Sequence, residues 1–140
     1  MSGWPDNYGR RVLVSVDSTL SEAARIAPQL SGPEWILAHE QTAARGRRGR
    51  VWMMPKSNFA ATLVLPISGP PAAAALRSFV ASLALRDAFV AVTGQDDAFA
   101  LKWPNDVLLR GGKVAGILLE SVGQSRGMTH LAIGIGVNLA

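Results

Sequence analysis

Cysteine is absent from the 140 residues of the sequence. Its absence excludes a disulfide framework, a thiolate zinc site and a cysteine nucleophile. The sequence also lacks an apolar run of the roughly 18 residues that a membrane-spanning helix needs. The first residues, MSGWPDNYGRRVLV, do not contain the apolar segment of a signal peptide. We therefore expect a cytoplasmic protein with no membrane partner.

The excess of positive over negative charge is confined to one short stretch. The chain has 14 Lys and Arg against 10 Asp and Glu, a net charge of +4. Four arginines lie in RGRRGR at 45–50, and without them the two signs balance at ten each. Proteins that follow a nucleic-acid backbone usually spread Lys and Arg over a face or groove. The concentration of arginine in one stretch favours a loop that binds a compact anion. A nucleic-acid-binding module is the alternative from another functional class.

About half of the residues (49%) are apolar, which is enough to build one compact unit over residues 1–140. Apolar patterns predict strands at 11–16, 34–39, 58–65, 98–103, 107–109, 113–119 and 128–138. Thr19 and Glu22 form a capping-box pattern for a short helix. Pro70 and Pro71 open a long helix, which Gly94 ends. Together, these strands and helices predict an α+β fold, a mixed β-sheet with helices packed on it.

Further details of this fold can be tested against a structure. Residues 41–57 show no apolar period and predict a long loop. A turn is expected at 123–127, before the last strand. In the long helix, the residues expected to face the core are Leu76, Phe79, Val80, Leu83 and Val90. Trp103 alternates with Leu101 on its predicted strand, which indicates a core position.

The arginine loop combines features that suit a nucleotide. Gly46 and Gly49 let the backbone approach a ligand closely. Arginine presents a planar fork that matches phosphate oxygens, and Trp52 offers a flat ring for stacking. A solvated charged loop, with Trp52 as a core residue, is the structural alternative. Sequence spacing alone leaves the two open.

Two further stretches place polar residues beside turns. In KWPND (102–106), Asn105 and Asp106 are common turn residues, but a carboxylate there also suits a Mg²⁺-bound phosphate. Lys113 follows Gly111-Gly112, so a tight hairpin could deliver a cation to a pocket; an exposed edge lysine is the simpler alternative. Gly116 suits a place where the backbone must approach a ligand.

Five motifs, taken together, resemble the catalytic core of biotin protein ligases. They are DST (17–19), QTAARGRRGRVW (41–52), KWPND (102–106), KVAGILLE (113–120) and GIGVN (134–138), in that order. The resemblance implies a class II synthetase-like fold and a two-step ligase. Biotin and ATP with Mg²⁺ would give biotinyl-5′-adenylate, and biotin would then pass to a lysine of a biotin carboxyl carrier domain, as in acetyl-CoA carboxylase.

The resemblance also implies roles for single residues. Biotin would be bound by Ser18, Thr19, Gln41, Arg45, Gly46, Arg47, Lys113 and Gly116. ATP and the adenylate would be bound by Arg47, Arg50, Trp52, Asn105, Asp106, Lys113 and Asn138, with Asp106 also on the Mg²⁺ side. Lys113, Arg45 and Arg47 would be the catalytic residues, because fixed cations offset the repulsion between a carboxylate and a phosphate.

The same resemblance sets expectations for the whole protein. In the family, the catalytic domain continues beyond the position of Ala140 with further helices and a small C-terminal β-barrel. The N-terminal DNA-binding domain of some members has no counterpart here, so we expect no DNA partner. A homodimer is compatible with the sequence. The rival functions are a lipoate or octanoate ligase of the same fold, a non-catalytic biotin-binding fragment, and the nucleic-acid-binding module.

Overall fold

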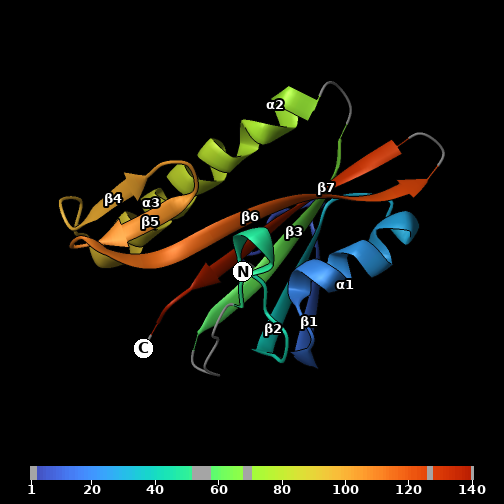
Figure 1. Ribbon diagram of the computed structural model, residues 1–140, viewed down its shortest axis with the longest axis horizontal. Coiled ribbons are helices and arrows are strands. Elements are labelled where there is room, and N and C mark those ends of the chain that lie inside the picture. The colour runs from blue at the N-terminus through green and yellow to red at the C-terminus, as the bar shows by residue number, and fades with distance from the viewer. Residues whose placement is uncertain (1–2, 52–57, 68–70, 126–127, 140) are drawn as a thin grey trace.

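The computed structural model describes residues 3–51, 58–67, 71–125 and 128–139 (Figure 1). Within these ranges the chain forms one seven-stranded sheet in the order β1-β2-β3-β7-β6-β5-β4. The strands are β1 (Gly9–Val16), β2 (Glu34–Gln41), β3 (Phe59–Ile67), β4 (Phe99–Lys102), β5 (Asp106–Leu109), β6 (Gly112–Ser125) and β7 (Met128–Val137). The α-helices are α1 (Thr19–Ile26), α2 (Pro71–Ala75) and α3 (Arg77–Thr93), and 3₁₀ turns lie at η1 (Ala27–Gln29) and η2 (Arg47–Gly49).

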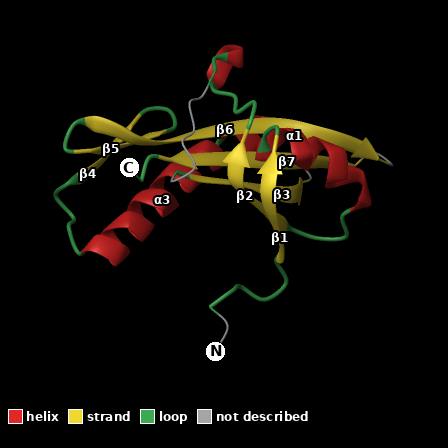
Figure 2. Cartoon of the chain, turned by 90° about the horizontal axis from the view of Figure 1, so that it is seen from below, coloured by secondary structure: helices red, strands yellow, loops and turns green. Residues whose placement is uncertain are grey.

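The sheet is mixed, as predicted. β1 and β2 are parallel and α1 connects them, whereas every other neighbouring pair is antiparallel. In Figure 1, α1 lies in front of the sheet and α3 behind it. α3 leads the chain from the β3 side of the sheet towards β4 and β5 (Figure 2). In the described part of the chain, no helix is both long and apolar enough to cross a membrane.

Because successive residues of a strand point to opposite faces, the apolar residues of the strands are divided between the two faces of the sheet. On one face, Ile36, Val64 and Ala132 pack with Leu20 and Ala23 of α1. On the other face, the next residues along the same strands pack against α2 and α3. Buried apolar side chains on both faces explain why the strands in the second half of the sequence are apolar at successive positions.

The short helix begins one residue earlier than the capping pattern indicated. Ser18, not Thr19, is the N-cap: its backbone is extended, and its Oγ accepts a hydrogen bond from the backbone N–H of Ser21 at 2.9 Å. Thr19 is the first helical residue. Because Thr19 does not need to cap the helix, its buried hydroxyl is available to the sheet.

The predicted long helix is divided, and its expected core stripe was wrong at every position except Val90. α2 ends at Ala75, a turn follows at Leu76, and α3 continues to Thr93. Gly94 ends α3 with a positive φ of 71°, as predicted. Most of the expected stripe is exposed, and α3 packs on the sheet through Ala81, Leu85, Phe89 and Val90. Because apolar residues surround most of α3, their spacing does not identify the buried face.

The expected core position of Trp103 was also wrong. Its side chain is 77% exposed and contacts the ring of Phe79, with centroids 6.4 Å apart. The neighbouring strand β4 is the edge of the sheet, where one side of a strand faces solvent.

Two hairpins complete the sheet. Arg110 and Gly111 connect β5 to β6 with φ values of 49° and 87°, the two positive values of a type I′ turn. The predicted hairpin is confirmed, but its turn lies one residue before the expected Gly111-Gly112, and Gly112 begins β6. The expected turn at 123–127 starts too early, because β6 continues to Ser125, which pairs with Met128. A register shift between Val122 and Gln124 marks an irregularity there.

Candidate functional site

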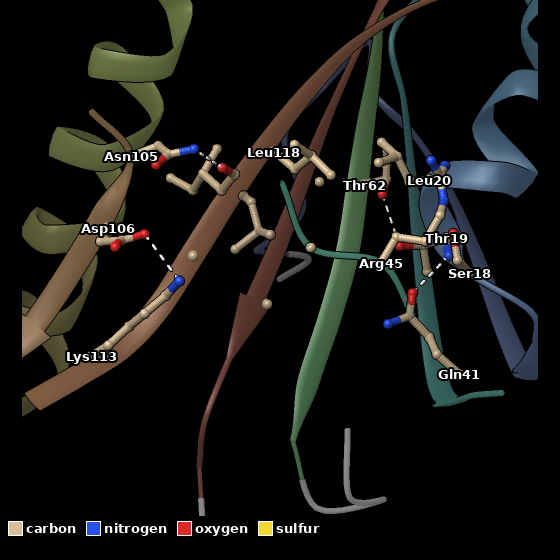
Figure 3. A pocket seen from close by; sticks show the side chains of 16 residues that line it. Ser18, Thr19, Leu20, Gln41, Arg45, Thr62, Asn105, Asp106, Lys113 and Leu118 are labelled. Carbon is tan, nitrogen blue, oxygen red and sulfur yellow. Dashed lines mark hydrogen bonds and ion pairs between the residues drawn. The ribbon is translucent and has the colours of Figure 1, made fainter. Parts of the chain in front are cut away.

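One pocket lies on the α1 face of the sheet, between the start of α1 on one side and the β5–β6 hairpin on the other (Figure 3). It brings together residues from all five motifs, although they are far apart in the sequence. The predicted site residues that line it are Ser18, Thr19, Gln41, Arg45, Gly46, Asn105, Asp106, Lys113 and Gly116.

The α1 end of the pocket holds uncharged hydrogen-bonding groups. The side-chain carbonyl of Gln41 accepts a hydrogen bond from the backbone N–H of Thr19 at 2.7 Å. The hydroxyls of Thr19 and Thr62 lie 2.8 Å apart and form a hydrogen bond (Figure 3). Thr62 lies on β3 and is fully buried. The groups around Thr19 are therefore uncharged, polar and buried, which suits a neutral ligand group with its own donors and acceptors, and the Arg45 guanidinium lies at the exposed rim of this end.

The hairpin end of the pocket is charged. The Lys113 ammonium lies 3.2 Å from Oδ1 of Asp106 (Figure 3). The Asn105 side-chain N–H₂ donates to the carbonyl of Ile117, and its buried Oδ1 has no partner among the described residues. The cation at this end suits the anionic part of a ligand, whereas the unused acceptor would be satisfied by a donor or by a cation that accompanies that anion.

Glycines form the floor between the two ends. Gly134 and Gly136 are two apart on β7, so both face the pocket, and Gly116 on β6 pairs with Gly136. A Cβ atom on Gly134 would lie 3.4 Å from both the Leu118 carbonyl oxygen and Cδ1 of Leu20, and 3.6 Å from Oγ1 of Thr62. The missing side chains keep this floor flat.

The loop after β2 is more ordered at its base than its composition indicated. Arg45 pairs with Val51 as an isolated β-bridge, and the N–H of Gly46 donates to the carbonyl of Arg50 at 2.6 Å. Between them, Arg48 and Gly49 have φ values of 59° and 72°. The base of the loop is thus a small closed turn beside the pocket.

The arginines of this loop do not share one environment. The Arg45 side chain lines the pocket, whereas Arg50 is exposed and is not among the lining residues. The Arg47 side chain and all of Trp52 lie outside what the structure describes, so their predicted contacts to phosphate and adenine stay predictions.

Asn138, expected at the adenine end, is hydrogen-bonded behind the hairpin end of the pocket. Its Oδ1 accepts from Nδ2 of Asn58 at 3.1 Å, and its own Nδ2 donates to the backbone carbonyl of Lys113 at 3.5 Å. It is not among the residues that line the pocket. Its position supports the strand that holds Lys113, and its expected contact to adenine stays a prediction.

Sequence reasoning missed several lining residues. Thr62, Leu20, Leu118 and the glycines at 134 and 136 all line the pocket. The alternating glycines of GIGVN were a usable signal, because glycine inside a strand often marks a close approach to the backbone. Thr62 gave no signal, since threonine is common in strands and only its partner Thr19 makes it distinctive.

Two electrostatic features bear on the site. Asp17, next to the pocket, accepts two hydrogen bonds from Arg25 at 2.6 and 3.0 Å and one from the Ser18 N–H, and these contacts lower the pKa of the Asp17 carboxyl to about 2. Across the described ranges, no group of three or more His, Cys, Asp or Glu gathers where it could hold a metal ion.

Comparisons with known proteins agree in both sequence and structure. The model of the biotin/lipoate A/B protein ligase family matches residues 9–138. The chain is 60% identical over 129 residues to the biotin–[acetyl-CoA-carboxylase] ligase of Paracoccus denitrificans, an alignment that spans 92% of this chain and 54% of that protein.

Solved structures of biotin protein ligases have the same fold. The Leishmania major biotin protein ligase, in complex with biotinyl-5-AMP, matches with a TM-score of 0.81 and 33% identity over 98% of this chain and 59% of that one. The Aquifex aeolicus ligase, in complex with biotin and ATP, matches with a TM-score of 0.67 and 29% identity over 93% of this chain and 52% of that one. The chain thus spans a little over half the length of these relatives.

Proposed function

The chain belongs to the biotin/lipoate A/B protein ligase family, and on this premise we propose that it forms the biotin- and ATP-binding part of a biotin protein ligase. The reaction would join biotin to AMP and then transfer biotin to a lysine of a carrier domain of acetyl-CoA carboxylase or a related carboxylase. The names of the relatives and the complexes with biotin and biotinyl-5-AMP support this function.

The two-ended pocket is the observation that supports the proposal most strongly. Biotin has a neutral ureido ring, with N–H donors and a carbonyl acceptor, at one end and a carboxylate at the other. The hydroxyls of Thr19 and Thr62 and the amide of Gln41 suit the ring. Lys113, at the opposite end, suits the carboxylate. Ligand pockets commonly combine an apolar body with a few such placed polar groups.

The first chemical step brings two anions together. A biotin carboxylate oxygen would attack the α-phosphorus of ATP, the bond from that phosphorus to the bridging oxygen would break, and pyrophosphate would leave. Lys113 lies where it can offset the repulsion and stabilise the charge on the phosphoryl oxygens. Arg45, also at the pocket edge, would contribute mainly to biotin binding, because Glu120 and Ser21 hold its guanidinium at the α1 end. No protein nucleophile is required.

In the second step, the neutral amine of a carrier lysine would attack the acyl carbon of the adenylate. The bond from this carbon to the phosphate oxygen would break, and AMP would leave with the electron pair. A closed loop base beside the pocket helps to keep water from the mixed anhydride. The roles of Arg47, Arg50, Trp52 and Asn138 in holding the nucleotide belong to this proposal.

Magnesium enters the proposal with ATP. Asp106, at the start of β5, supplies one carboxylate, and Asn105 just before it supplies one amide oxygen that has no partner within the described ranges. This pair of hard oxygen donors suits Mg²⁺, which usually keeps several waters and binds through one or two carboxylates plus phosphates. When bound, Mg²⁺ would neutralise phosphate charge. The donor set does not form a complete protein cage.

The rival functions make different demands on the pocket. The distal end of lipoate is a disulfide ring without strong hydrogen-bonding groups, so it would leave the buried polar groups around Thr19 unmatched. A nucleic-acid-binding module needs the loop arginines to face outward together, yet Glu120 and Ser21 hold the Arg45 guanidinium against the protein beside the pocket. A cytoplasmic location and the absence of a DNA partner are parts of the proposal.

Transfer of labelled biotin tests the proposal directly. The full-length gene product is incubated with ATP, Mg²⁺, biotin and a purified biotin carboxyl carrier domain, beside the same domain with its acceptor lysine changed to arginine. Label on the first domain alone supports the function. The function is wrong if neither domain is labelled while the protein binds DNA or RNA with a steep salt dependence.

A further inference from the structure

The side chain of Arg45 is held by a carboxylate from another motif. Its Nη1 donates to Oε1 of Glu120 at 2.8 Å and its Nη2 donates to Oε2 at 3.3 Å. Nη2 also donates to Oγ of Ser21 at 3.4 Å. A two-point contact of this kind fixes the plane of a guanidinium as well as its position. Glu120 therefore determines where the head group of Arg45 lies.

The backbone of Arg45 is fixed as well. The residue forms the bridge to Val51, and the next N–H, of Gly46, bonds to Arg50. Both ends of this long side chain are therefore anchored, the Cα by the loop base and the guanidinium by β6. An arginine with two anchors is already ordered before a ligand binds. Binding therefore costs less side-chain entropy than it would for a free arginine.

The contact also connects three separate elements around the pocket. Ser21, which accepts from Arg45, lies 3.1 Å from Ser18 through the two hydroxyls, and its N–H is capped by Ser18. Ser18 lines the α1 end of the pocket. A chain of contacts thus runs from Glu120 on β6, through Arg45 on the loop, to the cap of α1, and it spans the α1 end of the pocket.

Glu120 itself stands outside the pocket. It shares a face of β6 with Leu118 and Gly116, which line the pocket, but it is not among the lining residues. Its side chain is 31% exposed and that of Arg45 is 39% exposed. Three of the five N–H groups of Arg45 are used in these contacts, so the pairing does not exhaust its donors.

We infer that Glu120 is a positioning residue for Arg45. It holds the guanidinium beside the α1 end of the pocket, so that biotin meets a pre-oriented arginine at that end and a loop base that is already closed. This inference rests on the proposed function and assigns a task to a residue that touches neither substrate. Glu120 thereby acts on substrate affinity and on loop order, and the chemical step depends on it little.

The test uses ATP–pyrophosphate exchange by the full-length gene product as the biotin concentration is varied. Glu120→Gln removes the charge and keeps the shape. We expect the KM for biotin to rise about three- to tenfold, the range for a charged contact that is partly exposed, with kcat within about twofold of the parent. Hydrogen exchange should also quicken at the Gly46 amide, which closes the loop base.

Two controls separate positioning from general damage. Glu34→Gln removes an ion pair of the same kind, with Arg11, between β1 and β2, and it should leave KM and kcat unchanged. In an Arg45→Ala background, Glu120→Gln should add almost nothing, because residues that act through one contact are not additive.

The inference is overturned if Glu120→Gln matches the parent in KM and in Gly46 exchange. It is also overturned if the Glu120→Gln effect persists in full when Arg45 is alanine, or if kcat falls while KM stays. A parent protein that shows no biotin-dependent exchange overturns the proposed function first, and the inference with it.

Discussion

Lys113 and Asp106 form an ion pair across the β5–β6 hairpin, with Nζ 3.2 Å from Oδ1. The Asp106 side chain is 9% exposed and that of Lys113 is 41% exposed, so a nearly buried anion holds a cation that still reaches solvent. The two-residue turn at Arg110 and Gly111 fixes the hairpin. The lysine that follows two glycines in the sequence is thus held at the edge of a pocket.

Lys113→Ala should remove adenylation and leave the fold intact. The side chain lies at a hairpin and packs little, but it is the cation nearest to Asp106 in the pocket. By analogy with the loss of one oxyanion donor, the barrier should rise by about 2.7–4 kcal/mol, or about 10²–10³ in kcat. ATP–pyrophosphate exchange measures this loss of rate, and Arg77→Ala, at an exposed position of α3, is the control. Exchange at the parent rate would show that Lys113 has no such role.

Gly134→Ala should weaken biotin binding more than it weakens the fold. The added methyl group would meet Leu118 and Leu20 at 3.4 Å, so the neighbours must move by a few tenths of an ångström and the floor would rise into the pocket. One misplaced methyl group in a pocket costs about tenfold or more in affinity.

The measurement is calorimetric titration with biotin, beside thermal unfolding of the same variant. Gly32→Ala is the matched control, since a Cβ there would meet nothing within 4 Å. Equal biotin affinity in Gly134→Ala and Gly32→Ala would show that the ligand does not lie over this floor.

Arg25→Gln should raise the pKa of Asp17. That pKa is lowered from 3.8 to about 2, chiefly by hydrogen bonds from Arg25. A carboxyl whose pKa is lower in the folded chain stabilises the fold above about pH 4, and this contribution is lost as pH falls towards 2. Because the pair is exposed, it is worth roughly 0.5 kcal/mol at neutral pH. Carbon NMR of the Asp17 carboxyl tests this, and a pKa still near 2 in the variant would assign the shift to another group.

The fold was largely predictable because its strands follow simple rules. Strand positions, the mixed sheet, the glycine stop at 94 and, to within one residue, the tight hairpin before Lys113 all follow from local chemistry. The buried face of α3 was not predictable. Residues such as Phe79 and Val80 are as apolar as Leu85 and Phe89, and only the position of the helix over the sheet decides which side is covered.

The site was predictable where a motif supplied several polar residues and not where a partner on a distant strand was needed. Lys113, Gln41 and Thr19 could be named from their motifs, and they line one pocket. Thr62 and Glu120 could not, because each is defined by a contact to a residue at least 43 positions away. The packing of α1 and of the loop after β2 against the sheet, which the sequence does not state, brings such residues together.

The most direct test of the central claim is ATP–pyrophosphate exchange by the full-length gene product with biotin, lipoate or no acid. We predict exchange that requires biotin, with lipoate weaker by at least about a hundredfold, because only biotin satisfies the buried groups around Thr19. Exchange that is as fast with lipoate, or that is independent of added acid, would contradict the account.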